Sequence, residues 1–125
     1  MSVVVYQGVP SISFCVTTAQ KSYLFPGDVR DFEHCSMPVG CDVMLGHVWL
    51  GRGCAALGPE ETALSHYAQF VRRLQPKHLM LTHLYDLRRK ETDRWTYRHA
   101  LWIKEALKDS GIQITIPIPG EYVKC

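Results

Sequence analysis

The sequence predicts an α/β fold in which a mixed β-sheet carries helices on one face. Short β-branched or apolar segments of strand length alternate with two longer segments whose apolar residues recur at helical spacing. The expected order is three strands, a fourth strand, a helix, a strand, a helix and closing strands. Strand–helix–strand steps place neighbouring strands parallel. No repeat or linker-like run divides the 125 residues, so we expect one domain over residues 1–125.

The first third of the chain has the pattern of strands. Residues 2–6 form a β-branched run, and residues 11–17 alternate apolar and polar side chains. A short polar turn then leads to a returning strand over Ser22–Phe25, which a Pro-Gly pair ends. Asp28 therefore falls on the loop just beyond a strand.

The middle of the chain predicts a buried strand, a glycine-rich loop and a helix. Residues 41–46 are a short apolar run that fits a buried strand, and residues 48–58 form the loop. Pro59 suits the first helical position, and two glutamates after it favour the positive end of a helix. Because proline cannot continue a helix, Pro76 ends it.

The last third predicts a strand, a second helix and two closing strands. Residues 77–82 are apolar, with His83 at their carboxyl end, and a helix is expected from about residue 92 to residue 110. The closing strands are expected over residues 112–116 and 122–124. In mixed sheets of this kind, chemistry gathers outside the carboxyl ends of parallel strands, where Asp28 and His83 both lie.

The composition limits which binding partners and which cellular location we expect for the protein. Fourteen basic and twelve acidic side chains leave a net charge of +2, too small to drive non-specific binding to nucleic acid. No apolar run approaches the roughly 18 residues of a membrane span, and the first residues lack the pattern of a secretory signal. The five cysteines include no C-x-x-C pair, so we expect reduced thiols in a cytoplasmic protein.

Asp28 and His83 are the candidate metal ligands. A carboxylate oxygen and an imidazole nitrogen together suit zinc, manganese or iron. The glycine before Asp28 allows a sharp turn that brings the carboxylate forward. The alternative is structural, since Gly-Asp is a common turn and a histidine after a strand can simply bond to its neighbours.

Four segments, in order, resemble motifs of the metallo-β-lactamase superfamily. They are Leu-Phe-Pro-Gly-Asp at 24–28, the apolar strand at 41–45, Pro-Lys-His-Leu-Met-Leu-Thr-His-Leu at 76–84, and the ending at 114–123. The resemblance covers most of the chain from about residue 11. The superfamily's H-x-H-x-D-H signature belongs to its other half, and this chain contains no H-x-H. What is present therefore resembles the C-terminal half of such a domain.

The resemblance implies one half of an αββα sandwich with a metal site at one edge. Asp28 would match the aspartate that bridges two metals, and His83 would match the final histidine ligand. A metal-bound hydroxide then attacks an ester, amide, thioester or phosphodiester. With the other ligands missing, zinc, manganese or iron would bind weakly. The chain would be a remnant of a hydrolase that works only with a complementary half.

Three residues near the expected pocket are further candidates. His47 ends the middle strand, and Trp49 and Arg52 follow in the glycine-rich loop. They would bind substrate, with His47 also able to transfer protons. The alternative is that His47 packs beside the metal ligands or within the loop.

Two functions of different class remain open. The first is the metal-dependent hydrolase remnant, and the second is a non-enzymatic α/β assembly or binding module that keeps only the fold. In either case we expect a homodimer. Half of a sandwich should leave one apolar sheet face bare, and a second copy could cover it about 10 Å away across a twofold axis.

Overall fold

The computed structural model describes residues 1–7, 12–29, 31–48, 59–84, 90 and 94–124, with side chains from residue 12 onward and at residues 1–3. Six strands form a mixed sheet in sequence order: β1 (Ser2–Gln7), β2 (Ile12–Thr17), β3 (Ser22–Phe25), β4 (Val43–Gly46), β5 (His78–Leu81) and β6 (Gln113–Thr115). Strands β1 to β3 pair antiparallel, whereas β3 to β6 pair parallel. The predicted α/β class with a mixed sheet is confirmed.

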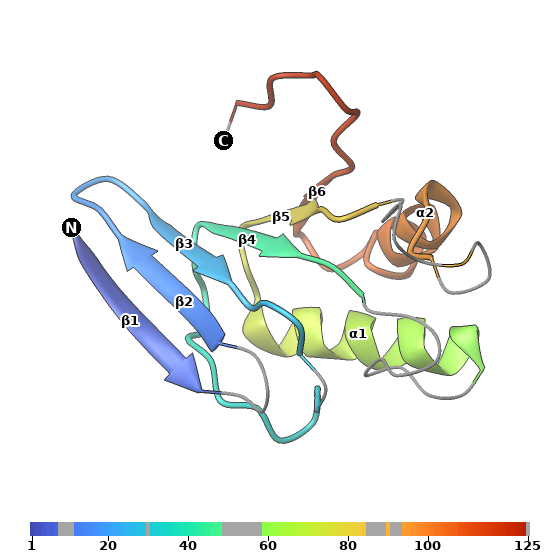
Figure 1. Cartoon of the computed structure of the whole chain (residues 1–125), viewed down its shortest axis with the longest axis horizontal. Coiled ribbons are helices and arrows are strands. Elements are labelled where there is room, and N and C mark those ends of the chain that lie inside the picture. Colours follow the sequence, from blue (N-terminus) through green and yellow to red (C-terminus); the bar gives the residue numbers. More distant parts are fainter. Residues whose placement is uncertain (8–11, 30, 49–58, 85–89, 91–93, 125) are drawn as a thin grey trace.

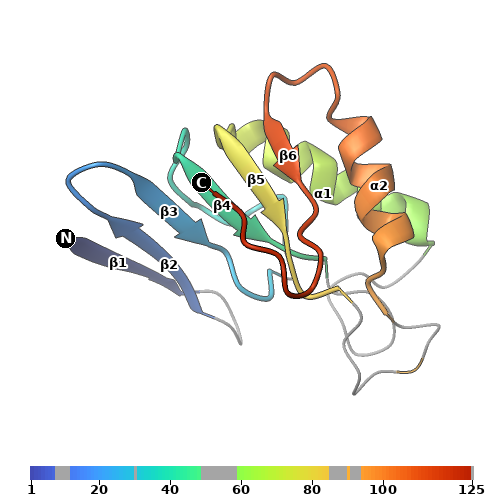
Figure 2. The ribbon, with the colours of Figure 1, turned by 90° about the horizontal axis from the view of Figure 1, so that it is seen from above.

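Two helices connect the parallel strands. Helix α1 (Glu60–Leu74) joins β4 to β5, and α2 (Tyr97–Ala106) joins β5 to β6. Both helices lie on the same face of the sheet, as Figures 1 and 2 show from perpendicular directions. Among the described residues, no helix is both long enough and apolar enough to cross a bilayer.

Helix α1 follows the local rules that its sequence predicts. Acidic residues occupy its first turn and basic residues its last turn, which complements the helix dipole. Pro59, expected at the first helical position, is instead the N-cap. The helix ends at Gln75, whose φ of 47° is left-handed and whose N–H donates to the carbonyl of Val71. Helix α2 begins later than expected. Thr96 is its N-cap, where it forms a capping box with His99.

The core lies between the helices and one face of the sheet. Leu24, Met44, Leu79 and Leu81 alternate along β3, β4 and β5 and are completely buried. They pack against the apolar side of α1, in which Ala63, Leu64, Tyr67, Ala68, Phe70, Val71 and Leu74 are buried. Replacing one of these leucines by alanine would cost about 2–5 kcal/mol.

The opposite face of the sheet is covered only in part. Val3, Ile12, Phe14 and Phe25 on β1, β2 and β3 are exposed by 38–52%. In contrast, Met80 on β5 is buried although it lies outside the helix-packed core. The chain after β6 passes over β4 and β5 on this side, above the sheet in Figure 1 and across it in Figure 2.

The predicted last strand over residues 122–124 is wrong. Residues 122–124 are described but do not form a strand, and Tyr122 is fully exposed. The expected turn before them is present: Glu121 N–H donates to the carbonyl of Ile118, and Gly120 has a φ of 86°. Residues after β6 therefore cross the sheet face instead of adding to its edge.

Candidate functional site

The candidate residues follow three adjacent parallel strands. Asp28 lies just after β3, His47 directly after β4, and His83 two residues after β5. Because β3, β4 and β5 pair parallel, their carboxyl ends meet at one edge of the sheet. The three side chains, which are 19 to 55 residues apart in sequence, come together there.

The backbone conformation at this edge orients the side chains of Asp28 and His83. Gly27 has a φ of 68°, and the N–H of Val29 donates to its carbonyl, so the chain turns tightly around Asp28. His83 has a φ of 60°, a left-handed conformation that few non-glycine residues adopt. Such backbone costs free energy and is characteristic of functional positions.

His47 contacts both of the other side chains. The Nε2–H of His47 donates to Oδ1 of Asp28 at 2.7 Å. The rings of His47 and His83 lie with their centroids 4.5 Å apart and their planes at 34°. A carboxylate, an imidazole and a second imidazole therefore form one cluster, which we call the Asp-His-His cluster.

Burial differs within the Asp-His-His cluster. The His47 side chain is only 10% exposed and that of Asp28 is 36% exposed, whereas His83 is exposed to solvent. Burial lowers the pKa of His47 below its usual value, and the nearby His83 adds to that effect, while the hydrogen bond to Asp28 opposes it. His47 is therefore neutral at pH 7, with its proton on the nitrogen that faces Asp28.

A buried tyrosine supports the strand end that carries His47. The hydroxyl of Tyr67 on α1 reaches so close to Gly46 that a Cβ there would lie 2.0 Å from it. Only glycine fits at this position without movement of the tyrosine. The hydroxyl has no hydrogen-bond partner among the described residues, and its burial raises the pKa of Tyr67.

The donor atoms of the cluster are of the chemical types that bind transition metals. Carboxylate oxygen and imidazole nitrogen are the ligands that zinc, manganese and iron take in proteins. In the described arrangement, Asp28 and His47 face each other. Accordingly, no group of three or more His, Cys, Asp or Glu side chains within the described ranges is arranged to hold an ion. Asp28 and His83 carry donor atoms of this kind, and the Asp28 carboxylate is bonded to His47 here.

Trp49 and Arg52, the other expected pocket residues, lie outside the described residues. The direct contact of His47 with Asp28 was not anticipated from the sequence, which placed His47 only near the pocket. A usable signal was present, however. All three residues follow apolar strand segments, and parallel neighbours bring such positions to one edge.

Two other histidines have structural partners elsewhere. The ring of His78 on β5 bonds to the hydroxyl of Thr115 on β6 at 2.8 Å. The buried His99 accepts the N–H of Thr96 at Nδ1 and contacts Glu60 through Nε2 at 3.1 Å. These contacts tie strands and helices together and leave the Asp-His-His cluster as the candidate site.

Comparison of the sequence with protein-family models found no match, and comparison with curated proteins found none either. The resemblance to the metallo-β-lactamase superfamily therefore stays a prediction that rests on its four sequence segments.

Proposed function

We propose that the chain is half of a metal-dependent hydrolase site, active only with a complementary half. The observation that carries this proposal is the convergence of Asp28, His47 and His83 from three successive parallel strands. The left-handed backbone of His83 beside the carboxylate–imidazole pair adds support, because such conformations cluster at functional sites. The substrates would be esters, thioesters or phosphodiesters.

Each residue has a distinct part in this proposal. Asp28 and His83 would hold a zinc, manganese or iron ion, and the complementary half would supply the other ligands. When bound, the ion supplies a hydroxide at neutral pH. His47 is a positioning residue, because its hydrogen bond orients the Asp28 carboxylate and its neutral ring can accept a proton.

Metal titration of the purified chain by calorimetry tests the proposal. We expect weak binding of zinc or manganese, reduced at least about tenfold by Asp28→Ala and by His83→Ala. His66→Ala is the matched control, because His66 is an exposed histidine on α1 that is not part of the cluster. An absence of heat with either metal, or equal loss in His66→Ala, would contradict the metal site.

The second candidate is a non-enzymatic assembly or binding module that has kept the fold. It is favoured by the described arrangement, in which Asp28 and His47 satisfy each other. Screening ester, thioester and phosphodiester substrates with added zinc separates the two functions. Metal-dependent turnover that His83→Ala abolishes would defeat the module, whereas an inert protein with an intact fold would support it.

We further propose that the complementary half is a second copy of this chain. The exposed apolar side chains Val3, Ile12, Phe14 and Phe25 on β1 to β3 support a sheet-on-sheet contact. Phe14 and Phe25 are cross-strand partners, so they form one continuous patch. Light scattering at micromolar concentration should give twice 14.3 kDa, and Phe14→Lys should return the monomer mass. A mass of 14.3 kDa that does not change on concentration would exclude the dimer.

A further inference from the structure

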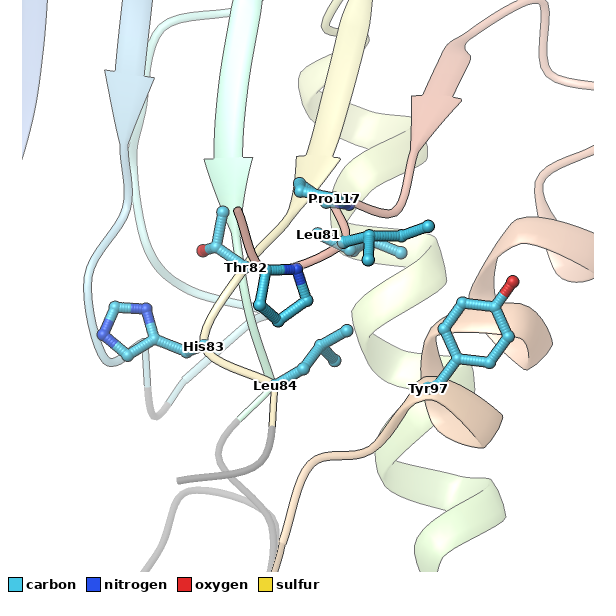
Figure 3. A pocket seen from close by; sticks show the side chains of 8 residues that line it. Leu81, Thr82, His83, Leu84, Tyr97 and Pro117 are labelled. Carbon is cyan, nitrogen blue, oxygen red and sulfur yellow. The ribbon is translucent and has the colours of Figure 1, made fainter. Parts of the chain in front are cut away.

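A cavity lies beside the Asp-His-His cluster, on the other side of the segment that follows β5. It has a volume of about 430 Å³, within the range of small-molecule sites. Its walls come from three parts of the chain: the end of β5 with residues 82–84, the first residue of α2, and residues 117–119 after β6. Figure 3 shows Leu84 pointing toward Tyr97, while His83 points away from both of them.

The lining of the cavity is apolar. Leu81, Leu84, Pro117 and Ile118 provide most of it, and no Asp, Glu, Lys or Arg is among the described residues that line it. Among the described residues that line it, the polar ones are Thr82, His83 and Tyr97. Such a lining cannot compensate the loss of hydration of a charged ligand. It favours an uncharged apolar group.

Two features indicate that the cavity is formed in advance and open to a ligand. Pro117 and Pro119 restrict the backbone of one wall, which reduces the entropy lost on binding. Tyr97 and Ile118 remain 46% and 61% exposed, so both have apolar surface that a ligand could still cover. The lining also includes an aromatic ring, that of Tyr97, and aromatic rings pack favourably against one another.

We propose that this cavity binds the uncharged aromatic part of a small-molecule substrate. His83 is among the residues that line the cavity, but its ring belongs to the Asp-His-His cluster and points to the other side of the segment that follows β5. A substrate whose aromatic part lies in the cavity would therefore extend around residues 82–84 to bring its ester or phosphodiester to the cluster. This last step rests on the proposed hydrolase function. Binding of the aromatic group itself does not need the metal.

The experiment measures binding of naphthalene-2-methanol, an uncharged aromatic probe, to the metal-free chain by calorimetry and by tyrosine NMR shifts. We expect a dissociation constant on the order of 0.1 mM, because the probe has few atoms. Ile118→Asp should weaken binding about tenfold or more, since it puts a carboxylate against the probe. Val39→Asp is the matched control: Val39 is 62% exposed but lies outside the cavity.

A second pair of variants guards against misfolding of Ile118→Asp. Tyr97→Ala should also weaken binding, whereas Leu101→Ala should not, although both residues lie on α2 and are 46% and 45% exposed. Phe14→Ser should leave binding unchanged, which excludes the exposed sheet face as the binding site. No binding at the solubility limit of the probe, or equal binding by Ile118→Asp, would overturn the proposal.

A charged probe provides a further comparison. 2-Naphthoate should bind more weakly than the alcohol, and equal affinity would overturn the preference for uncharged groups. Because these measurements use no metal, their failure leaves the metal titration unaffected. Conversely, probe binding without metal binding would keep the cavity and remove the hydrolase.

Discussion

The two ends of the parallel sheet each carry an aspartate, and the two carboxylates have different partners. At the amino end, Asp42 precedes β4 and accepts from the backbone N–H of Ser22 at 2.8 Å, from its hydroxyl at 3.0 Å and from Lys77 Nζ at 2.7 Å. At the carboxyl end, Asp28 follows β3 and accepts from the ring of His47 at 2.7 Å.

The partners determine what each carboxylate can do. Lys77 and then Ser22 hold the pKa of Asp42 at about 2, so its charge is retained over the ordinary pH range and ties β3, β4 and β5 together. Asp28 instead bonds to a largely buried imidazole whose pKa is lowered by burial, so no fixed positive charge holds the carboxylate. One end of the sheet is held by a charged pair, whereas the other carries the Asp-His-His cluster.

The largest expected effect is a loss of stability when the carboxyl end of β4 is overpacked. Gly46→Ala places a Cβ against the Tyr67 hydroxyl, so we expect the free energy of unfolding to fall by about 1–3 kcal/mol in urea denaturation. Tyr67→Phe removes that hydroxyl, which has no hydrogen-bond partner among the described residues, and should recover more than half of the loss in the double variant. The same loss in both backgrounds would contradict the close contact.

The next effect is the dependence of stability on pH that Asp42 contributes at the amino end of the sheet. The pKa of Asp42 is lower in the folded than in the unfolded chain, so its contribution is present above the unfolded value of about 3.9 and is lost as pH falls toward 2. Asp42→Asn should therefore be less stable than the wild type at pH 6, and the difference should shrink toward pH 2. A difference that stays constant between pH 6 and pH 2 would count against this role.

The smallest expected effect is the change in the free energy of unfolding of two glycine variants, one at each end of β5. Gln75 precedes β5 and His83 follows it, and both have left-handed φ angles of 47° and 60°. Glycine at either position should change the free energy of unfolding by no more than about 1 kcal/mol, because relief of the backbone offsets the entropy of glycine. In calorimetry, only His83→Gly should lose metal binding, and loss in Gln75→Gly as well would end the distinction.

The elements of the fold were accessible from the sequence because their signals are local. The Pro-Gly pair after Phe25 ended β3, and the prolines at 59 and 76 bounded α1 to within a residue. The strand expected over residues 122–124 failed for a complementary reason. Its apolar residues carry no information about whether they pair at a sheet edge or pass over a sheet face, which depends on distant residues.

The features of the candidate site also separate into those that local sequence determines and those that depend on distant residues. By itself, the sequence determined that Asp28 and His83 follow strands, because residue types and breaker positions are local properties. Only the tertiary structure decided that His47 donates a hydrogen bond to Asp28, that Tyr67 requires glycine at 46, and that residues 117–119 close a cavity beside His83. These contacts join residues 19 or more positions apart, and they depend on the parallel register of the strands and on helix packing, neither of which any short segment specifies.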